Sequence, residues 1–171
     1  MRLYDKVDLS ECYHLLENHV LLDDRDLIDR LIRGDMENDY TYSGHRRDIA
    51  TKFYSKEDAL KIISDTILNN TSAIKSWLDF RTERYLTISS SFMHPTGYGY
   101  AKGTLFSNKY TMYFCTVVLK LGYNGDTFII HTAYPSPNCM VDNQIKKDRE
   151  IFRRNRIKKK ELNRVGGISP K

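Results

Sequence analysis

The chain has 171 residues, of which 40% are hydrophobic and 29% are charged, a composition typical of one compact domain with a hydrophobic core. No apolar run approaches the roughly 20 residues that a membrane-spanning helix needs, and the first residues lack the apolar segment of a secretory signal peptide. The three cysteines are odd in number and irregularly spaced, which argues against a disulfide framework and a structural zinc site and favours a reducing compartment.

Positive charge is concentrated near the C-terminus. Residues 144–164 hold ten Lys/Arg and three Asp/Glu, a net charge of +7, whereas residues 1–143 sum to −3. We therefore divide the chain into a domain over residues 1–140 and a basic tail over residues 141–171. Attraction to an anionic partner should depend on the tail, because the domain itself is mildly acidic.

The first predicted helix lies in "DDRDLIDRLI". It begins with Asp23 and Asp24, two acidic residues that suit the start of a helix. Apolar residues then recur with helical spacing. The predicted stripe consists of Leu27, Ile28, Leu31 and Ile32.

Two further helices are predicted before residue 84. In "YSKEDALKIISDTILNN", Ser55 and Asp58 form a capping box. The apolar face behind it has a period of about 3.6 residues and consists of Ala59, Ile62, Ile63, Thr66 and Ile67. The next segment, "NNTSAIKSWLDF", has one apolar face made by Ile74, Trp77 and Leu78.

The second half of the domain has β character. The segments "RYLTISSSF", "YTMYFCTVVLKL" and "DTFIIHTAY" are rich in β-branched and aromatic residues. The strand over residues 110–121 is apolar on both faces, which predicts a central position, and "GYNGD" predicts a hairpin turn after it. "HPTGYGYAKG" (residues 94–103) is predicted to be a glycine-rich loop. Helices followed by antiparallel strands predict an α+β domain.

The tail contains "NQIKKDREIFRRNRIKKKELNR", which has good helix formers but few apolar residues. It is either a loosely attached basic helix or an arm that orders on binding. The last segment, "VGGISPK", is predicted to be disordered.

The stretch "FIIHTAYP" (residues 128–135) interrupts an apolar strand with polar side chains. Strict alternation gives one face with Phe128, Ile130, Thr132 and Tyr134, and another with Ile129, His131 and Ala133. Thr132 and Tyr134 would then lie side by side, where two hydroxyls can donate hydrogen bonds to phosphate oxygens. The alternative is an ordinary strand end whose tyrosine caps the core. His131 is predicted to be structural.

Histidines occur as a pair in "HLLENHV". On an ideal helix His14 and His19 lie about 140° apart, which argues against a two-histidine metal site. Either imidazole can act as an acid or a base near neutral pH. The alternative is that both lie at the surface or at the edge of the core.

Cationic and aromatic residues offer further candidates. Arg30 flanks the apolar stripe of its helix and can present its guanidinium to phosphate, or it can pair locally with Asp26. In the glycine-rich segment, Tyr98 and Tyr100 are candidates for stacking on bases and Lys102 for a phosphate contact. A simple flexible connection is the alternative there.

Five motifs in register resemble a known family. The segments "HLLENHV", "DDRDLIDRLI", "AIKSWL", "VVLK" and "HTAYP" follow one another over roughly residues 10–136. This order resembles the RNase A-like toxin domains at the C-termini of bacterial contact-dependent growth inhibition and other polymorphic toxins. The resemblance implies N-terminal helices packed on a C-terminal antiparallel sheet, as in RNase A. The chain lacks the glycines that usually surround the first motif, and its tail extends beyond the usual end of the domain.

The resemblance also implies roles for individual residues. The motif positions correspond to His19 as general base or acid, Arg30 as the group that neutralises the phosphorane, and Thr132 and Tyr134 as hydrogen-bond donors to it. His14 or Tyr134 would assist proton transfer. The implied reaction is metal- and cofactor-independent cleavage of RNA, with tRNA among the candidates, through a 2′,3′-cyclic phosphate.

The implied biology is that of a toxin. It would be delivered as the C-terminal part of a larger protein, act in the cytoplasm of a target bacterium and pair as a monomer with a cognate immunity protein. Two alternatives remain open: a non-catalytic RNA-binding or interaction module that works through the basic tail, and a nuclease of the barnase/colicin/RelE type.

Overall fold

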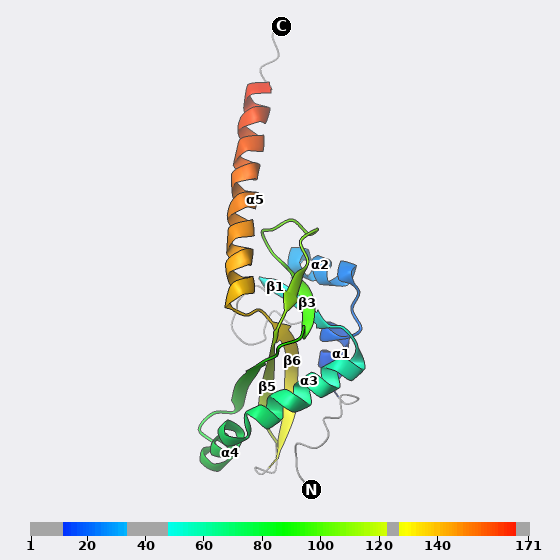
Figure 1. Ribbon diagram of the computed structural model, residues 1–171, viewed down its shortest axis with the longest axis vertical. Helices are drawn as coiled ribbons and strands as arrows, with labels where there is room; N and C mark the ends of the chain where they lie inside the picture. Colours follow the sequence, from blue (N-terminus) through cyan, green and yellow to red (C-terminus); the bar gives the residue numbers. More distant parts are fainter. Residues whose placement is uncertain (1–11, 34–47, 123–126, 167–171) are drawn as a thin grey trace.

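The computed structural model describes residues 12–33, 48–122 and 127–166, and Figure 1 labels most of its elements. The helices are α1 (Tyr13–His19), α2 (Asp24–Arg33), α3 (Lys56–Asn69), α4 (Thr71–Phe80) and α5 (Cys139–Gly166). The strands are β1 (Ile49–Phe53), β2 (Tyr85–Ser91), β3 (Gly97–Ala101), β4 (Tyr110–Met112), β5 (Phe114–Leu121) and β6 (Phe128–Ser136). No helix of the described part is both long and apolar enough to cross a membrane.

The strands form two antiparallel three-stranded sheets, with the orders β1-β3-β4 and β2-β5-β6. This confirms the α+β class. The single strand predicted over residues 110–121 was wrong, because the chain breaks at Tyr113 and divides into β4 and β5 in different sheets. β5 is nevertheless the central strand of its sheet, as predicted. Its burial alternates along the chain rather than being complete on both faces.

The glycine-rich segment was predicted to be a loop, and this was also wrong. Residues 97–101 form β3, which pairs on one side with β1 and on the other with β4. Glycine allows the backbone of β3 to approach its neighbours closely. A Cβ at Gly97 would lie 2.1 Å from the carbonyl oxygen of Lys52 and 2.5 Å from Cγ of Pro135. The segment is therefore a tightly packed strand that touches both sheets.

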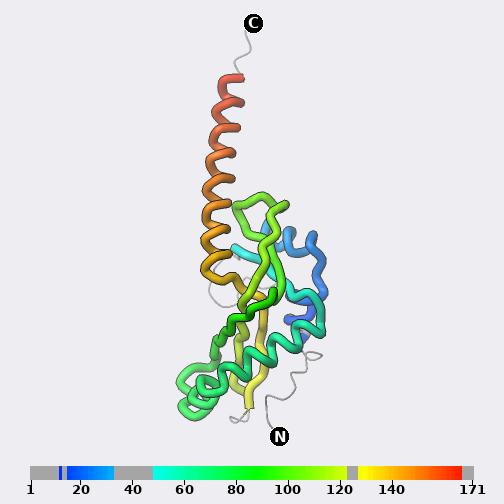
Figure 2. Tube along the Cα trace, in the orientation of Figure 1, coloured from blue at the N-terminus to red at the C-terminus, as the bar shows by residue number. Residues whose placement is uncertain are grey.

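The main core lies between α3 and the β2-β5-β6 sheet. The capping box is confirmed, because the Asp58 backbone N–H donates to the Ser55 hydroxyl over 3.1 Å. All five predicted face residues of α3 are buried. They pack against β5 residues such as Val117 and Leu119. Figure 2 shows α3 running across this sheet.

α2 confirms the first predicted helix but corrects its stripe. Leu27 and Leu31 are buried and pack against Ala50 and Tyr100 of the β1-β3-β4 sheet. Ile32 is 61% exposed, because the contact surface of this short helix is narrower than the predicted stripe.

β6 contains a bulge that changes which residues share a face. Leu119 pairs with Ile130, whereas Val118 pairs with Thr132, so His131 is an extra residue in the strand. Phe128 and Ile130 pack against the core before the bulge, and Ala133 is buried in it after the bulge. Thr132 and Tyr134 do share a face, as predicted, but it is the face opposite the core and not the one that holds Phe128 and Ile130.

α5 leaves the body as one long helix (Figures 1 and 2). Its first turns pack through Ile145, which is 1% exposed and lies against Ala101, Tyr110 and Met112. Residues 153–166 are exposed throughout. The tail is therefore a basic helix, including two residues of the segment predicted to be disordered. The remainder of that segment and most of the predicted turn "GYNGD" lie outside the described residues.

Candidate active site

His19 is the last residue of α1, and its side chain is only 4% exposed. Its Nδ1 lies 3.2 Å from the backbone oxygen of Thr51 in β1. A carbonyl oxygen only accepts hydrogen bonds, so Nδ1 carries the proton and donates it. In the neutral ring, Nε2 is then the nitrogen with the lone pair. This contact fixes both the tautomer and the orientation of the imidazole.

Tyr134 of β6 packs against His19. The two ring centroids are 5.6 Å apart and the rings are inclined by 36°. The contact joins a residue near the start of the domain to one near its end. The predicted site requires these two residues to lie close together. Tyr134 pairs with Thr116 in the sheet, two positions along from the Val118–Thr132 pair.

The hydroxyl of Thr132 has an unusual environment. Its Oγ1 is buried, and it has no hydrogen-bond partner among the residues that the structure describes. Buried polar atoms are almost always paired, since an orphaned one costs about 1–3 kcal/mol. On the face that carries Tyr134, this hydroxyl is therefore the candidate donor to a ligand.

Thr51 connects the two sides of the site. Its backbone oxygen accepts from His19, and its side-chain hydroxyl donates to the backbone oxygen of Pro135 over 2.7 Å. One residue thus fixes both the imidazole and the residue that follows Tyr134. Sequence reasoning missed Thr51, because a backbone carbonyl can come from any residue and leaves no side-chain signature.

Arg30 is half-buried on α2 and reaches the end of α1. Its Nη1 donates to the backbone oxygen of Asn18 over 2.9 Å. The sequence had offered a local ion pair between Arg30 and Asp26 as the alternative, and this hydrogen bond to Asn18 is a different contact. Because Asn18 precedes His19, the guanidinium is held next to the residue that carries the imidazole.

The other predicted histidines take different positions. His14 lies on α1, but its side chain is outside the described residues. His131 occupies the bulge of β6, and its ring meets the edge of Tyr85 at a centroid distance of 5.3 Å. Burial, and to a lesser degree the positive charge of Lys120, lower the pKa of His131 below its ordinary value.

Tyr98 and Tyr100 point toward α2. Both hydroxyls donate to the carboxylate of Asp24, and the Tyr100–Asp24 distance is 3.1 Å. The hydrogen bond from Tyr98 is the main cause that lowers the pKa of Asp24. Lys109 lies 3.4 Å from the same carboxylate, with its ammonium 4.0 Å from the centroid of the Tyr98 ring.

These contacts bear on the predicted substrate-binding set. Tyr100 is 6% exposed, so its ring is packed within the domain rather than displayed for stacking. Lys102 presents its backbone oxygen to Nε of Arg149 on α5, over 2.8 Å. None of these contacts involves His19 or Thr132, and the role of the set in substrate binding stays a prediction.

The domain that precedes α5 is similar to known proteins. The family model described as "Bacterial CdiA-CT RNAse A domain" matches residues 13–135. The fold is similar to a chain in the crystal structure of a CdiA-CT/CdiI complex from Y. kristensenii 33638, with a TM-score of 0.60 and 22% sequence identity. That match covers 72% of this chain and 99% of the other. The sequence matches no curated protein. α5 begins after the last residue that the family model matches.

Proposed function

The chain belongs to the bacterial CdiA-CT RNase A domain family, since the model of that family spans residues 13–135, and on this premise we propose that it is a toxin ribonuclease. It cleaves RNA by using the 2′-hydroxyl of the substrate as the nucleophile. The observation that carries the proposal is the contact of the His19 ring with Tyr134, with Nδ1 of His19 bound to the Thr51 carbonyl.

In the proposed reaction, Nε2 of His19 takes the proton of the 2′-hydroxyl. O2′ then forms a bond to phosphorus while the bond from phosphorus to O5′ breaks. The products are a 2′,3′-cyclic phosphate and a 5′-hydroxyl, whose proton comes from Tyr134 or His14. Because RNA supplies its own nucleophile, this sequence of steps requires no metal or cofactor.

Charge on the pentacoordinate phosphorane needs stabilisation in the transition state. The Arg30 guanidinium, held beside His19 through Asn18, is the proposed cation. The Thr132 hydroxyl is the proposed donor, and its buried oxygen, which has no partner in the described part of the chain, supports this role. A bond to the substrate would remove the cost of leaving that hydroxyl unpaired.

We infer the biological setting from the family. The protein is delivered as the C-terminal part of a larger toxin and acts on RNA in the cytoplasm of a target bacterium. The similar crystal structure is that of a CdiA-CT/CdiI complex, which supports a dedicated inhibitor protein as the partner of this chain.

Replacement of His19 tests the mechanism. His19→Ala should lower the rate of RNA cleavage by about 10²–10⁴-fold, the range supplied by general acid–base catalysis. The assay follows a dinucleotide substrate, with circular dichroism to verify folding. Because the imidazole is buried, His19→Asn provides a second, polar replacement that should be equally inactive.

The matched control is His94→Ala, since His94 is exposed and is expected to retain full activity. Activity should also persist in EDTA. Wild-type cleavage rates in both folded His19 variants would refute the assignment, and loss of activity on chelation would indicate a metal nuclease instead.

A further inference from the structure

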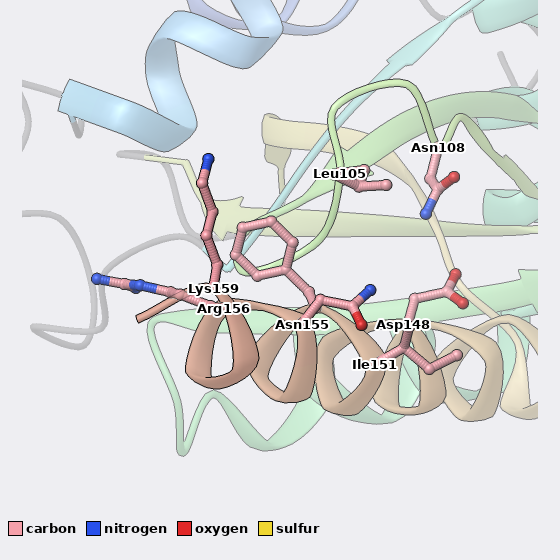
Figure 3. Close-up of a pocket in the computed structure, with 8 residues that line it drawn as sticks. Leu105, Asn108, Asp148, Ile151, Asn155, Arg156 and Lys159 are labelled. Carbon is pink, nitrogen blue, oxygen red and sulfur yellow. The ribbon is translucent and has the colours of Figure 1, made fainter. Parts of the chain in front are cut away.

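A cavity of about 400 Å³ lies between α5 and the segment that joins β3 to β4 (Figure 3). Its volume falls within the usual range of small-ligand sites. The body contributes Leu105 and Asn108, whereas α5 contributes Phe152, Asn155, Arg156 and Lys159. The cavity thus combines an aromatic ring, amide groups and two cations. It uses none of the residues assigned to the cleavage reaction.

Packing and hydrogen bonds at the base of α5 fix the position of the helix that forms one wall of the cavity. Ile145 packs in the core beneath it. Arg149 donates from Nε to the backbone oxygen of Lys102 over 2.8 Å, and from Nη2 to that of Asp48 over 3.2 Å. These bonds fix the helix relative to the β3–β4 segment, so the cavity does not have to form when a ligand arrives.

The electrostatic character of the cavity is positive. Asp148 is its acidic residue, and both of its oxygens already accept hydrogen bonds, from Tyr110 over 2.7 Å and from Gln144 over 2.9 Å. Arg156 and Lys159 have no hydrogen-bond or ion-pair partner among the residues 12–33, 48–122 and 127–166. Two cations against one carboxylate leave the lining with a net positive charge, which next to an aromatic ring favours an anionic ligand with a flat, apolar part.

We propose that this cavity binds one nucleotide of the RNA substrate at a distance from the cleaved bond. Phe152 stacks on the base, Asn155 bonds to the base edge, and Arg156 and Lys159 bind the adjacent phosphates. The proposal rests on the proposed function, since it assigns the second contact of the same substrate. The RNA would continue along α5, whose 28 residues make it about 42 Å long.

The charge distribution explains why an RNA-cleaving domain would need such a helix. Residues 1–143 carry a net charge of −3 and therefore do not attract RNA, whereas residues 144–164 carry +7. β6, which carries Thr132 and Tyr134, ends at Ser136, and α5 begins at Cys139. The binding helix therefore follows directly from the strand of the candidate active site.

The first test measures binding without cleavage. The probe is a 2′-O-methyl oligonucleotide of about twelve nucleotides, whose blocked 2′-oxygen cannot attack the phosphate. Fluorescence anisotropy at several salt concentrations gives the slope of log K against log salt. The double variant Arg156→Gln/Lys159→Gln should reduce this slope by about 1.4, because each phosphate contact to a single strand contributes about 0.7.

The matched control removes the same two charges from another face of the helix. Arg153→Gln/Lys160→Gln changes one exposed arginine and one exposed lysine that do not line the cavity. It should lower the slope by much less. Phe152→Ala should weaken binding by about 5-fold or more while leaving the slope unchanged, because stacking contributes independently of salt. Equal slope changes in the two double variants, or unchanged affinity in Phe152→Ala, would overturn the proposal.

Cleavage of a dinucleotide separates this proposal from the proposed function, because so short a substrate uses only the candidate active site. All α5 variants should cleave it at the wild-type rate, whereas His19→Ala should bind the 2′-O-methyl probe normally. Wild-type cleavage without any affinity for the probe would overturn the α5 site alone and point to an acidic protein as its partner. Cavity-dependent binding without cleavage would support the α5 site and refute the ribonuclease.

Discussion

The candidate active site and α5 are built in opposite ways. His19 is almost fully buried and bonded to Thr51, and Thr51 is bonded in turn to the strand of Tyr134. Residues 153–166 of α5 are exposed throughout and rich in cations. The first region depends on fixed geometry, which general acid–base chemistry requires. Beyond the cavity at its base, the second depends on charge that extends into solvent, which requires no such precision.

This difference predicts different responses to substitution. At the active site, a change should act on the rate of the chemical step, with little effect of salt. On α5, a change should act on affinity for long RNA and on its salt dependence, with little effect on a dinucleotide. α5 joins the body at Ile145, Asp148 and Arg149, which contact residues in and next to the β1-β3-β4 sheet and none of the residues of the candidate active site.

The largest effect on stability is expected where α5 joins the body. Ile145→Ala removes a buried side chain beneath α5 and should lower the free energy of unfolding by about 2–5 kcal/mol, because it leaves a cavity in the core. Urea denaturation measures this loss. Affinity for the 2′-O-methyl probe should fall with it, whereas the folded fraction should still cleave a dinucleotide.

Ile157→Ala is the control on the same helix. Ile157 is 51% exposed, so the change should alter the unfolding free energy by no more than about 0.5 kcal/mol. Equal destabilisation by both substitutions would mean that Ile145 does not anchor α5 in the core.

A smaller effect is expected at Thr51. Thr51→Val keeps the backbone oxygen that binds His19 but removes the hydroxyl that donates to Pro135. The unpaired carbonyl should cost about 1–3 kcal/mol of stability. The value of kcat for dinucleotide cleavage should fall about tenfold, because the strand that carries Tyr134 is no longer fixed relative to the imidazole.

Thr51→Ser retains the hydroxyl and should restore both quantities. The pH profile of kcat should be the same in all three proteins, because Thr51 is a positioning residue and does not exchange a proton. A shifted profile, or failure of serine to rescue, would contradict this role.

The sequence predicted α2, α3 and α4 well, because their periodicity and the Ser55 cap are local signals, but it made no prediction of the short α1. It also predicted four residues of the candidate site, and these predictions came from the family motifs rather than from strand geometry. The four are His19, Arg30, Thr132 and Tyr134. The bulge at His131 was not predictable, since it arises from the register of β6 against β5 and has no marker such as glycine. The break at Tyr113 was missed for a similar reason, because β4 and β5 are both apolar and only their tertiary pairing separates them.

The smallest predicted effect concerns His131, the histidine beside Thr132. Burial and Lys120 lower its pKa, so the imidazole should titrate below the ordinary value of 6.5 and be neutral at pH 7. The unfolded chain then binds a proton more readily than the folded one. The stability contributed by this group is therefore present above about pH 6.5 and is lost as the pH falls from there through the folded pKa.

NMR titration of the imidazole protons measures this pKa directly. Lys120→Gln should raise it toward 6.5, because it removes the positive charge that contributes to lowering it. Arg84 and Tyr85, which also lie at this edge of the sheet, are unchanged in that variant. Lys61→Gln makes the same change in charge on the exposed face of α3 and should leave the pKa of His131 where it is. A pKa at or above 6.5 in the wild type would contradict the burial of the His131 ring at the bulge of β6.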